Sequence, residues 1–143
     1  MLSTSCKYAL RAVVFLMSKA AGQQRYGIKE IAKAIEANEH TTAKILQLLA
    51  REGIIYSAKG PTGGFYLLPD AAPIYLIQII RLIDGDHFFF DCILGLKECS
   101  DKKPCPFHQY YKEARAGLFQ QFSSVTVQQL SRDIALGNTY LKR

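Results

Sequence analysis

Four side chains between residues 92 and 108 have the types and the spacing to bind one metal centre. They follow the pattern C-x6-C-x5-C-x2-H and are Cys92, Cys99, Cys105 and His108. Thiolate and imidazole are soft or borderline ligands that suit zinc as well as iron. The chain between them is rich in Gly, Ser, Asp and Pro, which disfavour helix and strand. We therefore expect a loop in which the four side chains can converge.

Length and composition describe an ordinary globular protein. The chain has 143 residues, 49% hydrophobic and 21% charged, which predicts one domain or one small domain with a dimerisation arm. The apolar run at 12–17 is too short for an export signal, and no run approaches the roughly 20 residues of a membrane span. We expect a cytoplasmic protein without a membrane partner. Its reduced thiols would then bind metal or sense redox state rather than form disulfides.

The positive charge is concentrated in the first part of the chain. Residues 1–60 hold nine Lys and Arg against four Asp and Glu, whereas residues 61–143 hold nine against eight. This asymmetry favours a polyanionic partner for the first part, although a basic surface that serves only solubility explains charge alone equally well.

Hydrophobic periodicity predicts three helices in this basic part. Residues 6–21 form an apolar, largely buried helix. Residues 28–35 carry Ile and Ala at i, i+3, i+4 and i+7, and a third helix spans about 40–52. One face of the third helix lacks large apolar groups and is rich in hydrogen-bond donors. Two short helices with such a face resemble a helix-turn-helix, and a merely solvated face is the alternative.

The next segment favours the DNA-binding interpretation. Two β-prone runs, 54–59 and 65–68, flank the turn sequence Gly60-Pro61-Thr62-Gly63-Gly64, which predicts a β-hairpin. A hairpin directly after the second helix of a helix-turn-helix is a wing, and Lys59 would lie at its tip. The predicted contacts with double-stranded DNA are made by His40, Thr41, Thr42, Lys44, Gln47, Lys59, Gly60, Thr62 and Gly63.

Beyond the hairpin we predict a helix at 73–84, the metal-binding loop, a long helix at 107–122 and a last helix opened by Thr126. The long helix carries an aromatic and apolar stripe that predicts a homodimer interface, with packing inside the same chain as the alternative. The stripe residues are Tyr111, Ala114, Leu118 and Phe122. The fold class is mainly α with a small β-hairpin, a winged helix-turn-helix plus a long C-terminal dimerisation helix. The predicted divisions are a DNA-binding domain with linker helix (1–85), a cluster-binding loop (86–108), and a dimerisation helix with a C-terminal helix (109–143).

These motifs, in this order, resemble the IscR/NsrR-type winged-helix regulators of the Rrf family over nearly the whole chain. The resemblance includes Tyr8-Ala9-Leu10-Arg11-Ala12, the wing Gly60-Pro61-x-Gly63-Gly64-Phe65 and Ile83-Asp84-Gly85. It ends with Cys92, Cys99, Cys105, Pro106 and His108. The resemblance implies a transcription regulator that holds an iron–sulfur cluster, [2Fe–2S] in IscR-like members, on the three cysteines and His108. A His ligand tends to raise the potential and can couple it to protonation.

The chain also departs from this family. Some nitric-oxide-sensing relatives use an acidic residue near the amino terminus of the partner subunit, but Ser5-Cys6-Lys7 offers no carboxylate here. That favours His108 as fourth ligand, with Cys6 or a bound small molecule as alternatives. The discriminating glutamate of IscR-like recognition helices falls on Ala43, and the wing carries Lys59 instead of Arg. We therefore expect a different operator sequence.

Two classes of function fit the sequence. The first is a homodimeric DNA-binding regulator whose operator affinity follows the state of its cluster, with a zinc site or a cluster-free thiol switch as variants. The second is an iron–sulfur electron carrier or cluster-transfer protein, which would need neither wing nor basic face. An enzyme is not expected, because no paired carboxylates and no nucleophile with a base appear in the motifs.

Overall fold

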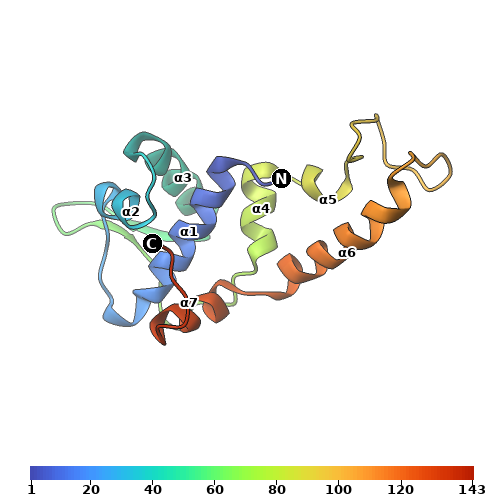
Figure 1. Cartoon of the computed structure of the whole chain (residues 1–143). Coiled ribbons are helices and arrows are strands. Elements are labelled where there is room, and N and C mark those ends of the chain that lie inside the picture. Colours follow the sequence, from blue (N-terminus) through green and yellow to red (C-terminus); the bar gives the residue numbers. More distant parts are fainter.

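The computed structural model describes all 143 residues and confirms a mainly helical fold with one two-stranded hairpin (Figure 1). The elements in chain order are α1 (Thr4–Ser18), the 3-10 turn η1 (Ala20–Gly22), α2 (Ile28–Ala34), α3 (Glu39–Arg51), β1 (Tyr56–Ala58), β2 (Gly64–Tyr66), α4 (Leu76–Asp84), α5 (His87–Phe90), α6 (His108–Ser124) and α7 (Val127–Ala135). No helix is both long and apolar enough to cross a membrane.

Helix α1 is the centre of the main core. Its buried side chains cover most of its circumference, as its apolar sequence predicts, and it packs against α3, α4 and α7. The Ser3 side chain caps the helix by accepting a hydrogen bond from the backbone N–H of Cys6 at 3.0 Å. The Ser3 backbone N–H and hydroxyl both donate to Asp84 at the end of α4. The amino end of α1 is thereby joined to the end of α4.

Helices α2 and α3 form the predicted helix-turn-helix. Asn38 caps α3 by accepting from the N–H of Thr41 at 2.8 Å. The inward face of α3 consists of Thr42, Ile45, Leu46 and Leu49, whereas Leu48 is half-buried. The opposite face of α3 lies in solvent.

The hairpin has a third partner that the sequence did not reveal. Strands β1 and β2 pair antiparallel with Tyr56 opposite Tyr66, and Tyr26 makes an isolated bridge to Phe65. Gly64 allows this pairing, because its φ of 141° is a glycine conformation and a Cβ there would lie 2.7 Å from the carbonyl oxygen of Tyr26. The segment before α2 therefore attaches the hairpin to the helical part of the fold.

The last helix packs into the main core beside α1, whereas the predicted division groups it with α6. Val127 of α7 is fully buried in the main core, and its N–H donates to the carbonyl of Ile74 at 2.8 Å. Helix α7 packs along α1. Its capping box, in which Thr126 and Gln129 bond each other's backbone, is present as predicted.

Helix α6 projects from the main core as an arm, and an aromatic cluster holds its base. Phe89 of α5 is 1% exposed, and its ring meets Phe119 and Phe122 edge-on at 5.3 and 6.0 Å between centroids. Phe88 packs against the same cluster, whereas Phe90 is 54% exposed. Figure 1 shows the cysteine loop at the far end of α6, away from α2, α3 and the hairpin.

We expect Phe89→Ala to lower the free energy of unfolding by about 3–5 kcal/mol, because it leaves a cavity between α4, α5 and α6. Chemical denaturation followed by circular dichroism measures the loss. Phe90→Ala is the matched control, because its exposed ring should cost far less. Equal losses for the two variants would contradict the role of Phe89 as the anchor of the arm.

Candidate functional site

The chain between α5 and α6, residues 91–107, contains no helix or strand, which confirms the predicted loop. It brings the four predicted ligands together as two pairs. The Cys105 thiol lies near enough to Cys92 to help lower the pKa of the Cys92 thiol, and Cys99 Sγ lies 3.3 Å from Nδ1 of His108. No group of three or more His, Cys, Asp or Glu side chains gathers in a metal-holding arrangement. Joining the two pairs around one centre requires a further movement of the loop.

The surroundings of Cys92 favour its thiolate. The backbone N–H of Leu96 is the main cause that lowers the pKa of this thiol, burial opposes it, and the N–H groups of Leu94 and Gly95 and the Cys105 thiol add to the lowering. The lowered pKa favours the sulfur anion, which is the form that binds metal.

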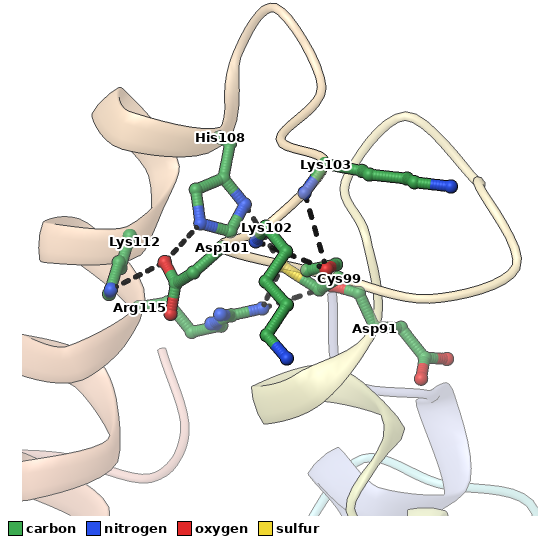
Figure 2. Close-up of polar contacts among 9 residues, drawn as sticks. Asp91, Cys99, Asp101, Lys102, Lys103, His108, Lys112 and Arg115 are labelled. Carbon is green, nitrogen blue, oxygen red and sulfur yellow. Dashed lines mark hydrogen bonds and ion pairs between the residues drawn. The ribbon is translucent and has the colours of Figure 1, made fainter.

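His108 is held from both sides of its ring (Figure 2). The side chain is 7% exposed in the first turn of α6, its Nε2 lies 2.8 Å from Asp101 Oδ1, and its Nδ1 faces Cys99. An ionised carboxylate only accepts, so Nε2 carries the proton of the neutral ring and Nδ1 presents its lone pair to the loop interior. A ligand histidine is held by a carboxylate in this way in many metal sites.

Three residues that contact the predicted ligands or their partners were missed by sequence reasoning: Asp101, Lys112 and Arg115. Lys112 Nζ donates to Asp101 Oδ1 at 2.7 Å. Arg115 Nη1 donates to Cys99 Sγ at 3.4 Å and to the carbonyl of Asp91 at 3.2 Å. His108, Lys112 and Arg115 are spaced i, i+4 and i+7, which places them on one helix face, so this spacing was the available signal. Nothing in the sequence marks Asp101, because its role depends on how the loop folds back.

Cys6 does not belong to the site, and the structure removes it as an alternative fourth ligand. It is fully buried in α1, packed with Ile77, Ile80 and Phe89. Burial, with the nearby Asp84 carboxylate as a second cause, raises the pKa of its thiol to about 12. Cys6 is therefore a protonated core residue at neutral pH.

The predicted DNA-binding residues lie in two exposed segments. On α3, His40, Lys44 and Gln47 are exposed and Thr41 is half-buried. In the hairpin turn, Lys59, Gly60 and Thr62 are exposed and Gly63 is half-buried. Thr42 is a correction. It is 1% exposed, and its hydroxyl donates to the carbonyl of Asn38 at 2.8 Å, so its side chain faces the core and not DNA.

The predicted dimerisation stripe is divided. Ala114 is exposed, Leu118 is 41% exposed, and half-buried Tyr111 lies under the guanidinium of Arg115. Phe122 packs into both hydrophobic clusters of its own chain, against Phe88 and Phe89. The alternative of packing within the chain therefore holds for Phe122, while the outer part of α6 keeps a free surface.

Comparison with known proteins is consistent with this architecture. The Rrf2 family model, described as an iron-dependent transcriptional regulator, matches residues 2–133. A putative helix-turn-helix regulator of Aquifex aeolicus is 30% identical over 131 residues, covering 90% of this chain and 89% of the relative. The regulator NsrR of Oceanobacillus iheyensis is 24% identical over 127 residues, covering 88% and 86%.

Solved structures show the same fold. CymR of B. subtilis, described as a global cysteine regulator, superposes with a TM-score of 0.71 at 24% identity, covering 97% of this chain and 98% of CymR. IscR of T. potens superposes with a TM-score of 0.73 at 19% identity, covering 97% and 91%. The chain is thus a winged-helix regulator and not an enzyme. It belongs to the Rrf2 family of DNA-binding transcriptional regulators, which confirms the family predicted from the sequence.

We expect Lys112→Met to raise the pKa of Asp101. The hydrogen bond from Lys112 is the largest cause that holds this pKa below its ordinary value of 3.8, and the bond from His108 comes second. A lowered carboxyl pKa adds stability that is present above the ordinary value and is lost as pH falls through the lowered one. Carbon-13 NMR titration of the metal-free protein measures the shift. Lys142→Met, in the exposed tail, should leave it unchanged, and an unchanged pKa in Lys112→Met would contradict the assigned contact.

Proposed function

We propose that the protein is a homodimeric transcription regulator whose operator affinity is set by an iron–sulfur cluster, most simply [2Fe–2S]. Cys92, Cys99, Cys105 and His108 would hold it. The observation that carries this proposal is His108, buried with Nδ1 toward Cys99 Sγ and Nε2 on Asp101. When bound, the cluster would supply a one-electron change of charge at the amino-terminal end of α6, where His108 lies.

The donor set fits such a group, although the four side chains form two pairs. One pair consists of two thiols, Cys92 and Cys105, and the other of the Cys99 thiol and the His108 imidazole. Iron accepts both kinds of donor, and the polypeptide between the pairs is irregular loop. The apolar side chains Ile93, Leu94 and Leu96 are about half exposed, so little packing opposes a change in loop path. A cluster would draw the pairs together and order the loop.

The opposite end of the molecule fits duplex DNA. The exposed face of α3 offers His40, Lys44 and Gln47 to base edges or phosphates, and the hairpin presents Lys59 at its turn. The net charge of +6 is concentrated in this half of the chain. A major-groove helix with a basic hairpin beside it provides both groove readout and phosphate attraction.

Pairing with a second copy of the chain would couple the cysteine loop to the DNA-binding end of the molecule. Tyr110 and Leu118 of α6 are 74% and 41% exposed, and Ala114 leaves room for a close helix contact. Pairing along α6 would set the distance between two α3 helices, which must match half-sites about one helical turn apart. Because α6 begins at His108, one of the proposed ligands, ordering of the loop would directly affect how the two α6 helices pair.

Two variants of this function, and one function of a different class, would use the same loop. Zinc suits the same donors. A cluster-free thiol switch is favoured by the contact between Cys92 and Cys105, and the oxidised form of S. aureus CymR is a fold relative at 24% identity. An electron carrier explains the cysteines but leaves the winged helix-turn-helix without a use.

The test begins with protein made without oxygen. Wild-type protein should show visible absorbance and contain iron and sulfide, whereas a zinc protein would be colourless. Cys92→Ala should remove the colour yet sediment as a folded dimer, and its operator affinity should differ from that of the loaded protein. Cys6→Ala is the control and should keep its colour. Equal affinities of the loaded protein and Cys92→Ala would contradict the sensor role.

Lys59→Ala should weaken DNA binding for all sequences and reduce the slope of log affinity against log salt by about one, because one phosphate contact is lost. Fluorescence anisotropy with a labelled duplex at several salt concentrations measures this slope. Lys142→Ala, in the tail, is a charge-matched control that should leave it unchanged. An unchanged slope for Lys59→Ala would mean that the hairpin does not touch phosphate.

A further inference from the structure

One cation reaches into the cysteine loop from α6 without being a ligand candidate. Arg115 lies two turns after His108 on the same face of the helix, and Figure 2 shows its guanidinium directed toward Cys99. Its Nη1 donates to Cys99 Sγ at 3.4 Å and to the carbonyl oxygen of Asp91 at 3.2 Å. Arg115 thus touches a predicted ligand and the residue just before another, Cys92.

No carboxylate neutralises this guanidinium. Arg115 takes part in none of the ion pairs of the structure, whereas the neighbouring Lys112 is paired with Asp101. The other face of the Arg115 side chain lies over the ring of Tyr111, 5.6 Å from its centroid. The aromatic ring and the half-buried position limit the directions in which the guanidinium can turn, and its positive charge faces the sulfur.

A positive N–H donor at a ligand sulfur has a defined effect on a redox centre. Reduction adds negative charge to a cluster and its thiolates, and a nearby cation stabilises that charge. Hydrogen bonds to ligand sulfurs are among the features that set cluster potentials. Lys could supply the charge, but its ammonium is a compact, strongly hydrated point charge, whereas the planar guanidinium is more weakly hydrated and stacks over Tyr111.

We propose that Arg115 is a positioning residue that raises the reduction potential of the centre in the cysteine loop by donating to Cys99 Sγ. The inference rests on the proposed function, because it requires a cluster at this site. It adds the regulation of that site: the potential at which the regulator changes state is set from α6, the helix that we assign to dimer pairing. The competing role is mechanical, in which Arg115 only ties the loop to α6 through the Asp91 carbonyl.

The experiment compares cluster-loaded wild type, Arg115→Met, Arg115→Lys and the control Arg132→Met, an exposed arginine of α7. Iron and sulfide content measures loading, and an anaerobic redox titration followed by absorbance measures the midpoint potential. At the wild-type midpoint, Arg115→Met should show about a tenfold lower ratio of reduced to oxidised centre, which is 59 mV for one electron. Arg115→Lys should show a smaller decrease, and Arg132→Met none.

Each outcome either supports or overturns the proposed role of Arg115. An Arg115→Met protein that loads fully and keeps the wild-type midpoint overturns the proposal. If Arg115→Met does not load, Arg115→Lys decides: a lowered midpoint supports the proposal and an unchanged one overturns it. Failure of both variants to load also overturns it, since Arg115 would then be a mechanical tie. A wild-type protein that takes up no cluster overturns the proposed function and this inference with it, whereas equal potentials in loaded proteins overturn the inference alone.

Discussion

Burial of Phe89 constrains where both ends of the cysteine loop can lie. The ring of Phe89 packs against Phe119 and Phe122 of α6 and shares a small core with Ile77 and Ile80 of α4. The loop leaves α5 just after this ring and returns to the first turn of α6. Since one buried aromatic cluster fixes both helices, the loop must close over the outer part of α6. Its polar and sulfur side chains therefore meet the helix face that carries His108, Lys112 and Arg115.

Polar contacts, rather than apolar packing, hold the loop in this position. Its side chains Ile93, Leu94 and Leu96 are about half exposed, while Asp101, Cys99 and the Asp91 carbonyl each bond to α6. Such contacts are individually modest, so the loop can change its path at little cost. The main core, in contrast, is held by apolar packing, because α1 is buried on most sides by α3, α4 and α7. The loop and the main core are thus held by different kinds of contact, polar in the loop and apolar in the core.

Particular residues show how far sequence reasoning reached. Apolar periodicity located α1 to α4, and the Gly-Pro turn located the hairpin, because both patterns report local geometry or the burial of one face. The same reasoning placed Thr42 on the DNA side, yet its hydroxyl can bond the Asn38 carbonyl and enter the core. Phe122 fits the predicted dimerisation stripe but packs inside its own chain, because α5 brings Phe88 and Phe89 against it. Periodicity tells which residues share a face, not what covers that face.

By itself the sequence determined the family, the helix-turn-helix with its hairpin, and the four side chains that could serve a metal, since residue types and short spacings encode these features. Only the tertiary structure decided that the ligands form two pairs, that α7 joins the main core, and that Asp101 and Arg115 surround the site. These facts depend on contacts between segments far apart in the chain or on the path of an irregular loop. Neither long-range contacts nor an irregular loop path produces a periodic pattern in the sequence, because both are set by the packing of whole elements.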